Sequence, residues 1–234
     1  MRKRMDKDRD NPAITRRQAL AGAAGLGAGV AVGTTTRAEQ SGAKLCVLTP
    51  EAEEGPFYFD PELVRADITE GKQGAPLKLA LQVVEAKDCA AIKDARVDIW
   101  HADGLGAYSG FARQATGSTK GQTFLRGTQF TNGDGQTSFA TIYPGWYPGR
   151  TPHIHFKVFL DGGKVLTGQL YFPDPVTDRV YAELLPYRER KGERDTLNSS
   201  DGIFRDEGGA QTVVNLTEED GTYLAALVLG VERG

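Results

Sequence analysis

The chain has 234 residues, of which 39% are hydrophobic and 25% are charged, and its formal net charge is -3. This composition is ordinary for a globular domain with one substantial core, and charges of both signs are mixed along the chain. Nucleic acids and anionic membrane surfaces are therefore excluded as expected partners, and we expect a small-molecule ligand.

The first 38 residues differ in character from the rest of the chain. A charged stretch carries Arg16 and Arg17, and the run ALAGAAGLGAGVAVG that follows is short, weakly hydrophobic and rich in alanine and glycine. This layout is typical of a secretory signal, and the paired arginines favour twin-arginine export to the periplasm or the exterior. A lone transmembrane anchor is the alternative, but the run is too short and too rich in glycine to span hydrocarbon comfortably. We expect cleavage near Ala38, a domain over residues 39–234 and no stable membrane insertion.

Cys46 and Cys89 are the only cysteines of the chain. Two cysteines cannot form a zinc or iron–sulfur site alone, whereas an oxidising compartment permits a disulfide between them. The sequence does not give their separation in space, so two unpaired thiols are the alternative.

From Leu77 onward, short runs of alternating or β-branched residues follow one another. These runs are LKLALQVVEA, ARVDIWHA, TFLRGTQFT, TSFATIYPG, HIHFKVFL and VLTGQLYF, and TVVNLTEEDGTYLAALVLGV closes the chain as a hairpin. Turn residues lie between them at the spacing expected of an all-β fold. The stretch VYAELLPYRERKG predicts only a turn or two of helix, limited by Pro186. We predict one β-sandwich of mixed or antiparallel strands with little helix and with long irregular segments at 51–60, 104–122 and 188–204.

His153 and His155 lie two residues apart in a predicted strand, and the chain has only three histidines. Successive strand residues point to opposite faces, so both imidazoles share one face while Ile154 and Phe156 pack on the other. Two imidazoles on one face can bind one metal ion. For an isolated pair of this kind, two partly buried histidines satisfied by backbone carbonyls are the alternative.

The loop YPGWYPG before the histidine pair supplies phenol groups, and no acidic residue or cysteine lies close by in sequence to complete a zinc site. A phenol has an ordinary pKa of about 10, so tyrosine ligation at neutral pH requires a strongly Lewis-acidic ion. This requirement points to Fe(III) before zinc or magnesium. Two phenolates and two neutral imidazoles leave one positive charge on Fe(III), which a bound hydroxide neutralises.

Several ordered stretches, GPFY, VDIWHADGLGAYSG, FLRGTQFTNGDG, FATIYPGWYPGRTPHIHFKV and TGQLYF, together resemble the intradiol ring-cleavage dioxygenases. These are non-haem Fe(III) enzymes that open catechols between their two hydroxyl groups. The similarity is to the catalytic core of the protocatechuate dioxygenase branch and covers the chain from about Leu48 to Phe204. The resemblance implies four metal ligands, which are Tyr108, Tyr147, His153 and His155. Tyr143 is then a pocket or packing residue, and His101 lies outside the ligand set.

The same resemblance implies roles for residues around these ligands. Arg150 stabilises negative charge that develops on the substrate ring, and a guanidinium suits this role because it stays protonated. Gln169 lies beside the substrate or serves as a packing amide, and Tyr58 lines the pocket. We expect the loops around Tyr58, Leu105 and Ser109 to determine substrate selectivity.

The resemblance further implies that a catechol binds as a chelating dianion and is opened by O2 to a cis,cis-muconate-type diacid. Tyr147 and His155 are the implied axial ligands, and Tyr147 and a bound hydroxide leave the iron and accept the two catechol protons. Tyr108 and His153 are the implied equatorial ligands.

Two other kinds of protein are alternatives to this enzyme. One is an exported iron- or catechol-binding protein without turnover, and the other is a structural β-sandwich adhesion module. The sequence shows no long N-terminal helical segment of the kind through which catechol 1,2-dioxygenases dimerise, so we do not expect that interface here. A homo-oligomer built in another way is left open.

Overall fold

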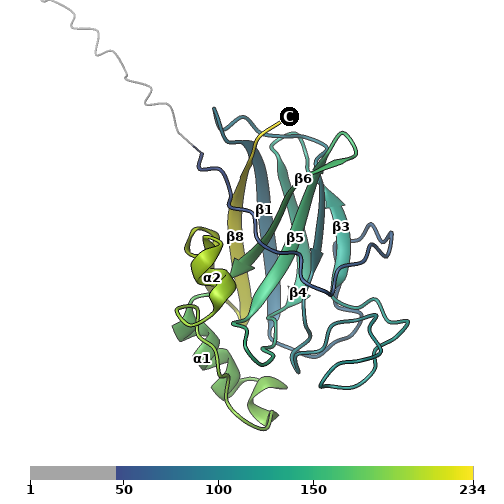
Figure 1. Ribbon diagram of the computed structural model, residues 1–234, viewed down its shortest axis with the longest axis vertical. Coiled ribbons are helices and arrows are strands. Elements are labelled where there is room, and N and C mark those ends of the chain that lie inside the picture. Colours follow the sequence, from purple (N-terminus) through teal and green to yellow (C-terminus); the bar gives the residue numbers. More distant parts are fainter. Residues whose placement is uncertain (1–45, 234) are drawn as a thin grey trace, which may run out of the picture. The chain divides into compact units, whose positions relative to one another are not determined.

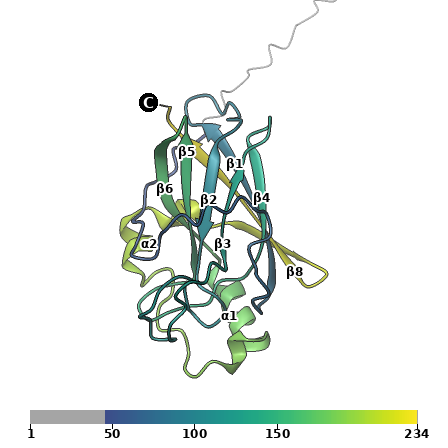
Figure 2. The ribbon, with the colours of Figure 1, turned by 90° about the vertical axis from the view of Figure 1, so that its right-hand side faces the viewer.

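Eight strands form two four-stranded sheets in the computed structural model, which describes residues 46–233 (Figures 1 and 2). The first sheet has the order β4-β1-β8-β7 and the second the order β3-β2-β5-β6. The strands are β1 (Pro76–Glu85), β2 (Arg96–Trp100), β3 (Arg126–Phe130), β4 (Gln136–Ile142), β5 (His153–Leu160), β6 (Gly163–Tyr171), β7 (Asn215–Glu219) and β8 (Thr222–Val231). Neighbouring strands are antiparallel except for β1 and β8, which run parallel. The predicted all-β sandwich of mixed strands is confirmed, as is the closing hairpin.

The core lies between the two sheets. In β1, Leu77, Leu79 and Leu81 are buried, whereas the intervening Lys78 and Ala80 are exposed. This alternation fits a sheet with one face on the core and one face in water. Each such side chain stabilises the fold by about 1.5–3 kcal/mol through burial.

The strand β5 is buried on both of its faces along most of its length. Ile154 and Phe156 belong to the main core, as predicted, and His153, His155 and Lys157 project from the opposite face. These three are also buried, because irregular segments of the chain cover the outer face of the second sheet. Figure 2 shows that long irregular segments gather at the lower end of the sandwich, close to α1.

Helices occupy a larger part of the C-terminal third than the sequence predicted. The helix α1 (Asp174–Glu183) begins six residues before the predicted stretch at 180–192, because Pro175 is compatible with a first helical turn. A 3-10 turn follows at Tyr187–Glu189. A second helix, α2 (Gly202–Asp206), and the 3-10 turn Gly209–Thr212 lie beyond it. Within residues 46–233, no helix is long and apolar enough to cross a membrane.

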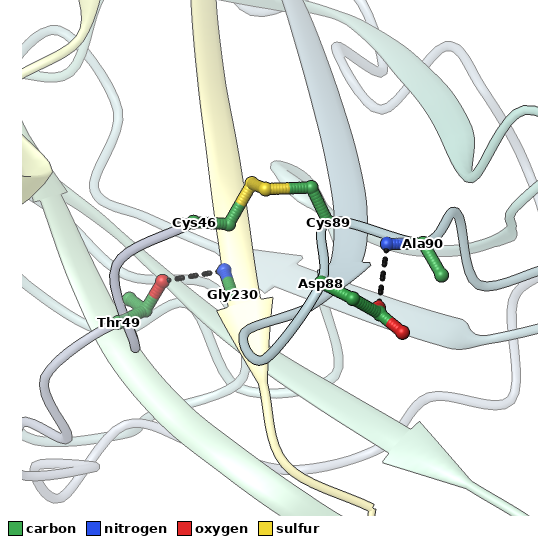
Figure 3. The surroundings of a disulfide bond; sticks show 6 residues. All are labelled: Cys46, Thr49, Asp88, Cys89, Ala90 and Gly230. Carbon is green, nitrogen blue, oxygen red and sulfur yellow. Dashed lines mark hydrogen bonds between the residues drawn. A yellow bond between two sulfur atoms is a disulfide. The ribbon is translucent and has the colours of Figure 1, made fainter. Parts of the chain in front are cut away.

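Cys46 and Cys89 form a disulfide across a sequence separation of 43 residues (Figure 3). The bond passes over the end of β8 and joins the chain before Thr49 to the turn that follows β1. Thr49 is itself tied to β8, since its backbone N–H donates to the carbonyl of Gly230 at 2.9 Å. The disulfide that the sequence left open is therefore present. The predicted export signal and its cleavage site near Ala38 lie outside the described residues.

Candidate metal centre

The second sheet carries a row of polar and aromatic side chains on the face turned away from the core. Arg126 of β3 pairs with Trp100 of β2, Trp100 with His155 of β5, and His155 with Gln169 of β6. Directly paired residues on neighbouring strands project to the same side, so these four side chains form one line across the sheet. His153 projects from the same face, two residues before His155. The sheet thereby brings both histidines beside Gln169.

The segment 51–60 covers this row from outside. The backbone N–H of Ala52 donates to the carbonyl of Thr167 at 2.9 Å, and the side-chain amide of Gln169 donates to the carbonyl of Glu53 at 2.8 Å. Further along, the ring of Phe57 stacks on that of Tyr108 with 4.3 Å between centroids. The cover removes the row from water and so strengthens the electrostatic interactions within it.

Tyr147 and Arg150 are brought together by a tight turn immediately before β5. The N–H of Arg150 donates to the carbonyl of Tyr147 at 3.2 Å, and Gly149 has a φ of 82°. Proline in the second position and a glycine with positive φ in the third are the residues that a type II turn favours, and Pro148 and Gly149 occupy these positions. The turn holds both side chains at the end of the histidine-bearing strand.

Tyr108 reaches the same place from the loop that follows β2. The carboxylate of Asp103 accepts hydrogen bonds from the N–H groups of Leu105 and Ala107, at 3.0 and 2.9 Å, and so shapes this loop. Gly106 lies so close to the carbonyl of Trp146 that a Cβ atom there would be 2.3 Å from it. This close approach packs the loop of Tyr108 against the segment that carries Tyr147.

Four side-chain donors converge at one point, and they are the four predicted ligands. The Nε2 atom of His153 lies 3.2 Å from the Oη of Tyr108, 3.1 Å from the Oη of Tyr147 and 3.1 Å from the Nε2 of His155. The Nδ1 of His153 lies 2.7 Å from the carbonyl of Thr151, which accepts its proton and leaves Nε2 with a free lone pair. Two loops and one strand thus bring two phenol oxygens and two imidazole nitrogens together.

In the protein alone, burial holds these four groups in their neutral forms. Desolvation, together with the positive charge of Arg150, lowers the pKa of His153 to about 3. Desolvation also lowers the pKa of His155 well below its ordinary value and raises the pKa of both Tyr108 and Tyr147. Neutral imidazoles are the form that binds metal ions, whereas the phenols must lose their protons to do so.

The chemistry of this donor set fits a strongly Lewis-acidic cation. Within residues 46–233, no group of three or more His, Cys, Asp and Glu side chains is arranged to hold a metal ion, so a set built on this histidine pair includes the phenols. A trivalent ion offsets the cost of ionising two buried phenols, which a zinc or magnesium ion does less well. The four donors therefore fit Fe(III).

Arg150 is fixed beside the four donors by two neighbours. Its Nε donates to the carboxylate of Asp201 at 2.9 Å, and its Nη2 donates to the side-chain carbonyl of Gln169. The hydroxyl of Tyr171 donates to the same oxygen of Gln169 at 3.1 Å. Gln169 is thus a hydrogen-bonding partner of Arg150, in addition to packing on the sheet.

The structure places the other predicted pocket residues less directly at the four donors. The hydroxyl of Tyr58 donates to the carboxylate of Asp98 at 3.0 Å, and its ring lies 4.7 Å from that of Trp100. Leu105 is exposed in its loop, whereas Ser109 is buried and its hydroxyl donates to the carbonyl of Phe124. The roles of Tyr58, Leu105 and Ser109 in substrate binding stay predictions.

Tyr143 and His101 lie apart from the four donors. Tyr143 belongs to the main core, where its hydroxyl is 2.7 Å from that of Thr177. The imidazole of His101 is also buried, and its ring nitrogens lie 2.8 Å from the carbonyl of Ala102 and 2.7 Å from the hydroxyl of Thr141. Both residues therefore have partners elsewhere.

Sequence reasoning did not single out three residues that contact either a predicted ligand or Arg150. Phe57 stacks on Tyr108, Trp100 stacks on His155 with 4.8 Å between ring centroids, and Asp201 pairs with Arg150. The alternation of β2 contained a signal for Trp100, because it placed this residue on the face opposite Ile99. Nothing in the sequence pairs Asp201 with a residue 51 positions away.

Comparison with known proteins identifies the class to which this fold and centre belong. A family model described as "Dioxygenase" matches residues 53–182, which is more than half of the chain. An intradiol ring-cleavage dioxygenase from Tetranychus urticae has a solved structure with 34% identity and a TM-score of 0.74, over 80% of this chain and 95% of that one. The dioxygenase domain of a dioxygenase and carbohydrate-binding protein fusion from Streptomyces sp. SirexAA-E has 28% identity and a TM-score of 0.61, over 80% of this chain and 99% of that one.

Among curated proteins, catechol 1,2-dioxygenase 1 of Acinetobacter lwoffii is 31% identical over 174 residues, which are 62% of this chain and 55% of that protein. The chain spans about half the length of the curated relatives it matches first. The chain belongs to the intradiol ring-cleavage dioxygenase family.

Proposed function

We propose that this protein is a non-haem Fe(III)-dependent dioxygenase that opens a catechol-type ring between its two hydroxyl groups. The observation that carries the proposal is the convergence of two phenol oxygens and the Nε2 of His155 on the Nε2 of His153, each within 3.2 Å. Tyr108, Tyr147, His153 and His155 hold the metal. The relatives named catechol 1,2-dioxygenase support a catechol as the substrate class.

The reaction balances without an external reductant. The carbon–carbon bond between the two hydroxylated carbons of the ring breaks, and both atoms of O2 enter the product. The product is a cis,cis-muconate-type diacid. Bound Fe(III) supplies the Lewis acidity that ionises the two phenols and the catechol and draws electron density from the ring.

Tyr147 and Arg150 are the residues that act on the substrate. The Oη of Tyr147, as a phenolate, takes up one of the two catechol protons, and a hydroxide takes up the other. This phenol suits the role because it is only partly buried, whereas Tyr108 is fully buried. Arg150 Nη1 lies 3.5 Å from both Tyr147 Oη and His153 Nε2, where it stabilises negative charge on the ring. The ring of Phe57 stacks on that of Tyr108 and covers this ligand.

Oxygen uptake with product analysis tests the proposal. Purified iron-loaded protein should consume one O2 per catechol, and ¹⁸O2 should place both labelled atoms in a ring-opened diacid. A spectral change on adding catechol, without O2 consumption, would instead identify an iron- or catechol-binding protein. A ring-opened product that carries an aldehyde would contradict cleavage between the two hydroxyl groups.

We also propose that the protein is exported to the periplasm or the exterior. The paired Arg16 and Arg17 before an alanine- and glycine-rich run support this location, and the Cys46–Cys89 disulfide suits an oxidising compartment. Expression with and without residues 1–38 tests it, because only the full chain should reach the periplasm. Equal amounts of both forms in the cytoplasm would contradict it.

A further inference from the structure

Asp201 is a carboxylate with no exposure to water and with all of its hydrogen-bonding capacity in use. Its Oδ2 accepts from Arg150 Nε at 2.9 Å and from the backbone N–H of Thr151 at 2.8 Å. Its Oδ1 accepts from the N–H groups of Ile203 and Phe204, at 2.9 and 3.1 Å, and so caps the start of α2. A buried carboxylate destabilises the fold unless it is paired in this way. Capping α2 uses only one of the two carboxylate oxygens, so the cap alone does not explain why an aspartate lies here.

The guanidinium of Arg150 is held at two of its three nitrogens. Asp201 binds Nε, and Gln169 binds Nη2, while Gln169 is itself held by the carbonyl of Glu53. The remaining nitrogen, Nη1, lies 3.5 Å from Tyr147 Oη. A planar guanidinium bound at Nε and Nη2 has little freedom to rotate, so the direction of Nη1 is fixed by its two partners.

The helix α2, which Asp201 caps, packs against the second sheet. The ring of Phe204 in α2 meets the ring of Tyr171 edge-on, with 5.0 Å between centroids. Tyr171 also donates its hydroxyl to Gln169. The two partners of Arg150 are therefore linked to one another through Phe204 and Tyr171.

From this geometry we propose that Asp201 is the positioning residue for Arg150, which it orients so that Nη1 faces the substrate side of the metal centre. The inference rests on the proposed function and extends it to a residue that touches neither metal nor substrate. Asp201 acts on the substrate through Arg150, by fixing one edge of the guanidinium. Loss of this contact therefore misplaces the charge-stabilising group without removing it.

The substitution Asp201→Asn separates this role from that of a helix cap. Asparagine retains an oxygen that can cap α2, but its NH2 group would then face two N–H donors, Arg150 Nε and Thr151 N, and repel them. Asp206→Asn is the matched control, because it removes the same charge from the same helix at an exposed side chain. Asp201→Ser also keeps a capping oxygen and serves if the asparagine variant does not fold.

The steady-state test compares kcat, KM and iron content. We expect Asp201→Asn to retain iron and to lower kcat roughly 10–100-fold, with a smaller change in KM, because a displaced catalytic group mainly affects the transition state. Asp206→Asn should match the wild type. In an Arg150→Ala background, Asp201→Asn should have little further effect, since its partner is already gone. A wild-type kcat in Asp201→Asn, or an equal loss in both backgrounds, would overturn the proposal.

A second readout does not depend on turnover. In metal-free protein with ¹⁵N-labelled arginine, the Nε–H resonance of Arg150, identified by its loss in Arg150→Lys, should exchange slowly with water. Exchange should be faster in Asp201→Asn and unchanged in Asp206→Asn, and equal exchange in all three proteins would overturn the proposal. If the wild type consumes no O2 with catechols, the proposed function fails, and this exchange measurement still decides whether Asp201 orients Arg150.

Discussion

Replacing both cysteines by serine, Cys46→Ser with Cys89→Ser, removes the covalent link between the N-terminal segment and the turn after β1. The disulfide closes a loop with a sequence separation of 43 residues. The chain-entropy relation for a loop of this length gives a stabilisation of about 4 kcal/mol at 25 °C, which acts mainly on the unfolded state. For a domain of this size, 1 kcal/mol corresponds to about 2–4 °C in Tm, so we expect a decrease of roughly 8–16 °C.

Thermal and urea unfolding of chelator-treated protein measure this effect, because bound metal would add its own stabilisation. Reduction of the wild type should reproduce the decrease, and a reducing agent should leave the serine variant unaffected. An unchanged unfolding midpoint in the serine variant would refute the reasoning. Two reactive thiols in the native, non-reduced protein would refute the disulfide itself.

Three further predictions concern the centre and its ionisable groups. His153→Ala and His155→Ala should each abolish iron retention, while His101→Gln should keep it; near-stoichiometric iron in either alanine variant would contradict the ligand assignment. Tyr147→Phe should keep some iron, lose most activity and shift the visible absorption band, so an unchanged spectrum would exclude this phenol as a ligand. In metal-free protein, burial lowers the pKa of His101 to about 4 and of His153 to about 3, so the unfolded state binds more protons as the pH falls below 6.5. The free energy of unfolding should therefore be highest above pH 6.5 and should decrease, as the pH falls toward these folded-state pKa values, by up to about 1.4 kcal/mol per pH unit for each histidine. Urea unfolding at pH 7 and pH 5 measures this decrease, and equal stability at the two pH values would contradict the prediction.

The strands were predictable because their pattern is local. Each of the six runs from Leu77 to Phe172 overlaps one strand of the structure, and the alternation in β5 correctly assigned His153 and His155 to one face. Helix α1 was placed too late in the sequence, because its first turn, with Asp174 and Pro175, resembles a turn as much as a helix start. Parallel pairing of β1 with β8 has no local signal, since these strands are far apart in the sequence.

The candidate ligands were also accessible from the sequence, through the motifs that the resemblance supplied. Their surroundings were not, because they depend on side chains that meet only in the folded chain. Phe57 reaches Tyr108 from a covering segment, and Asp201 reaches Arg150 from a short helix. The hydroxyl of Tyr58 donates to Asp98, and no local pattern specifies this pair; its role in lining the pocket stays a prediction.

The visible absorption spectrum of the purified protein, recorded together with its metal content, shows whether the four donors form a ferric centre. We expect iron near one equivalent and a broad phenolate-to-iron charge-transfer band that moves to longer wavelength when catechol is added without oxygen. A colourless protein that holds no iron after reconstitution would show instead that the four donors converge without forming a ferric centre.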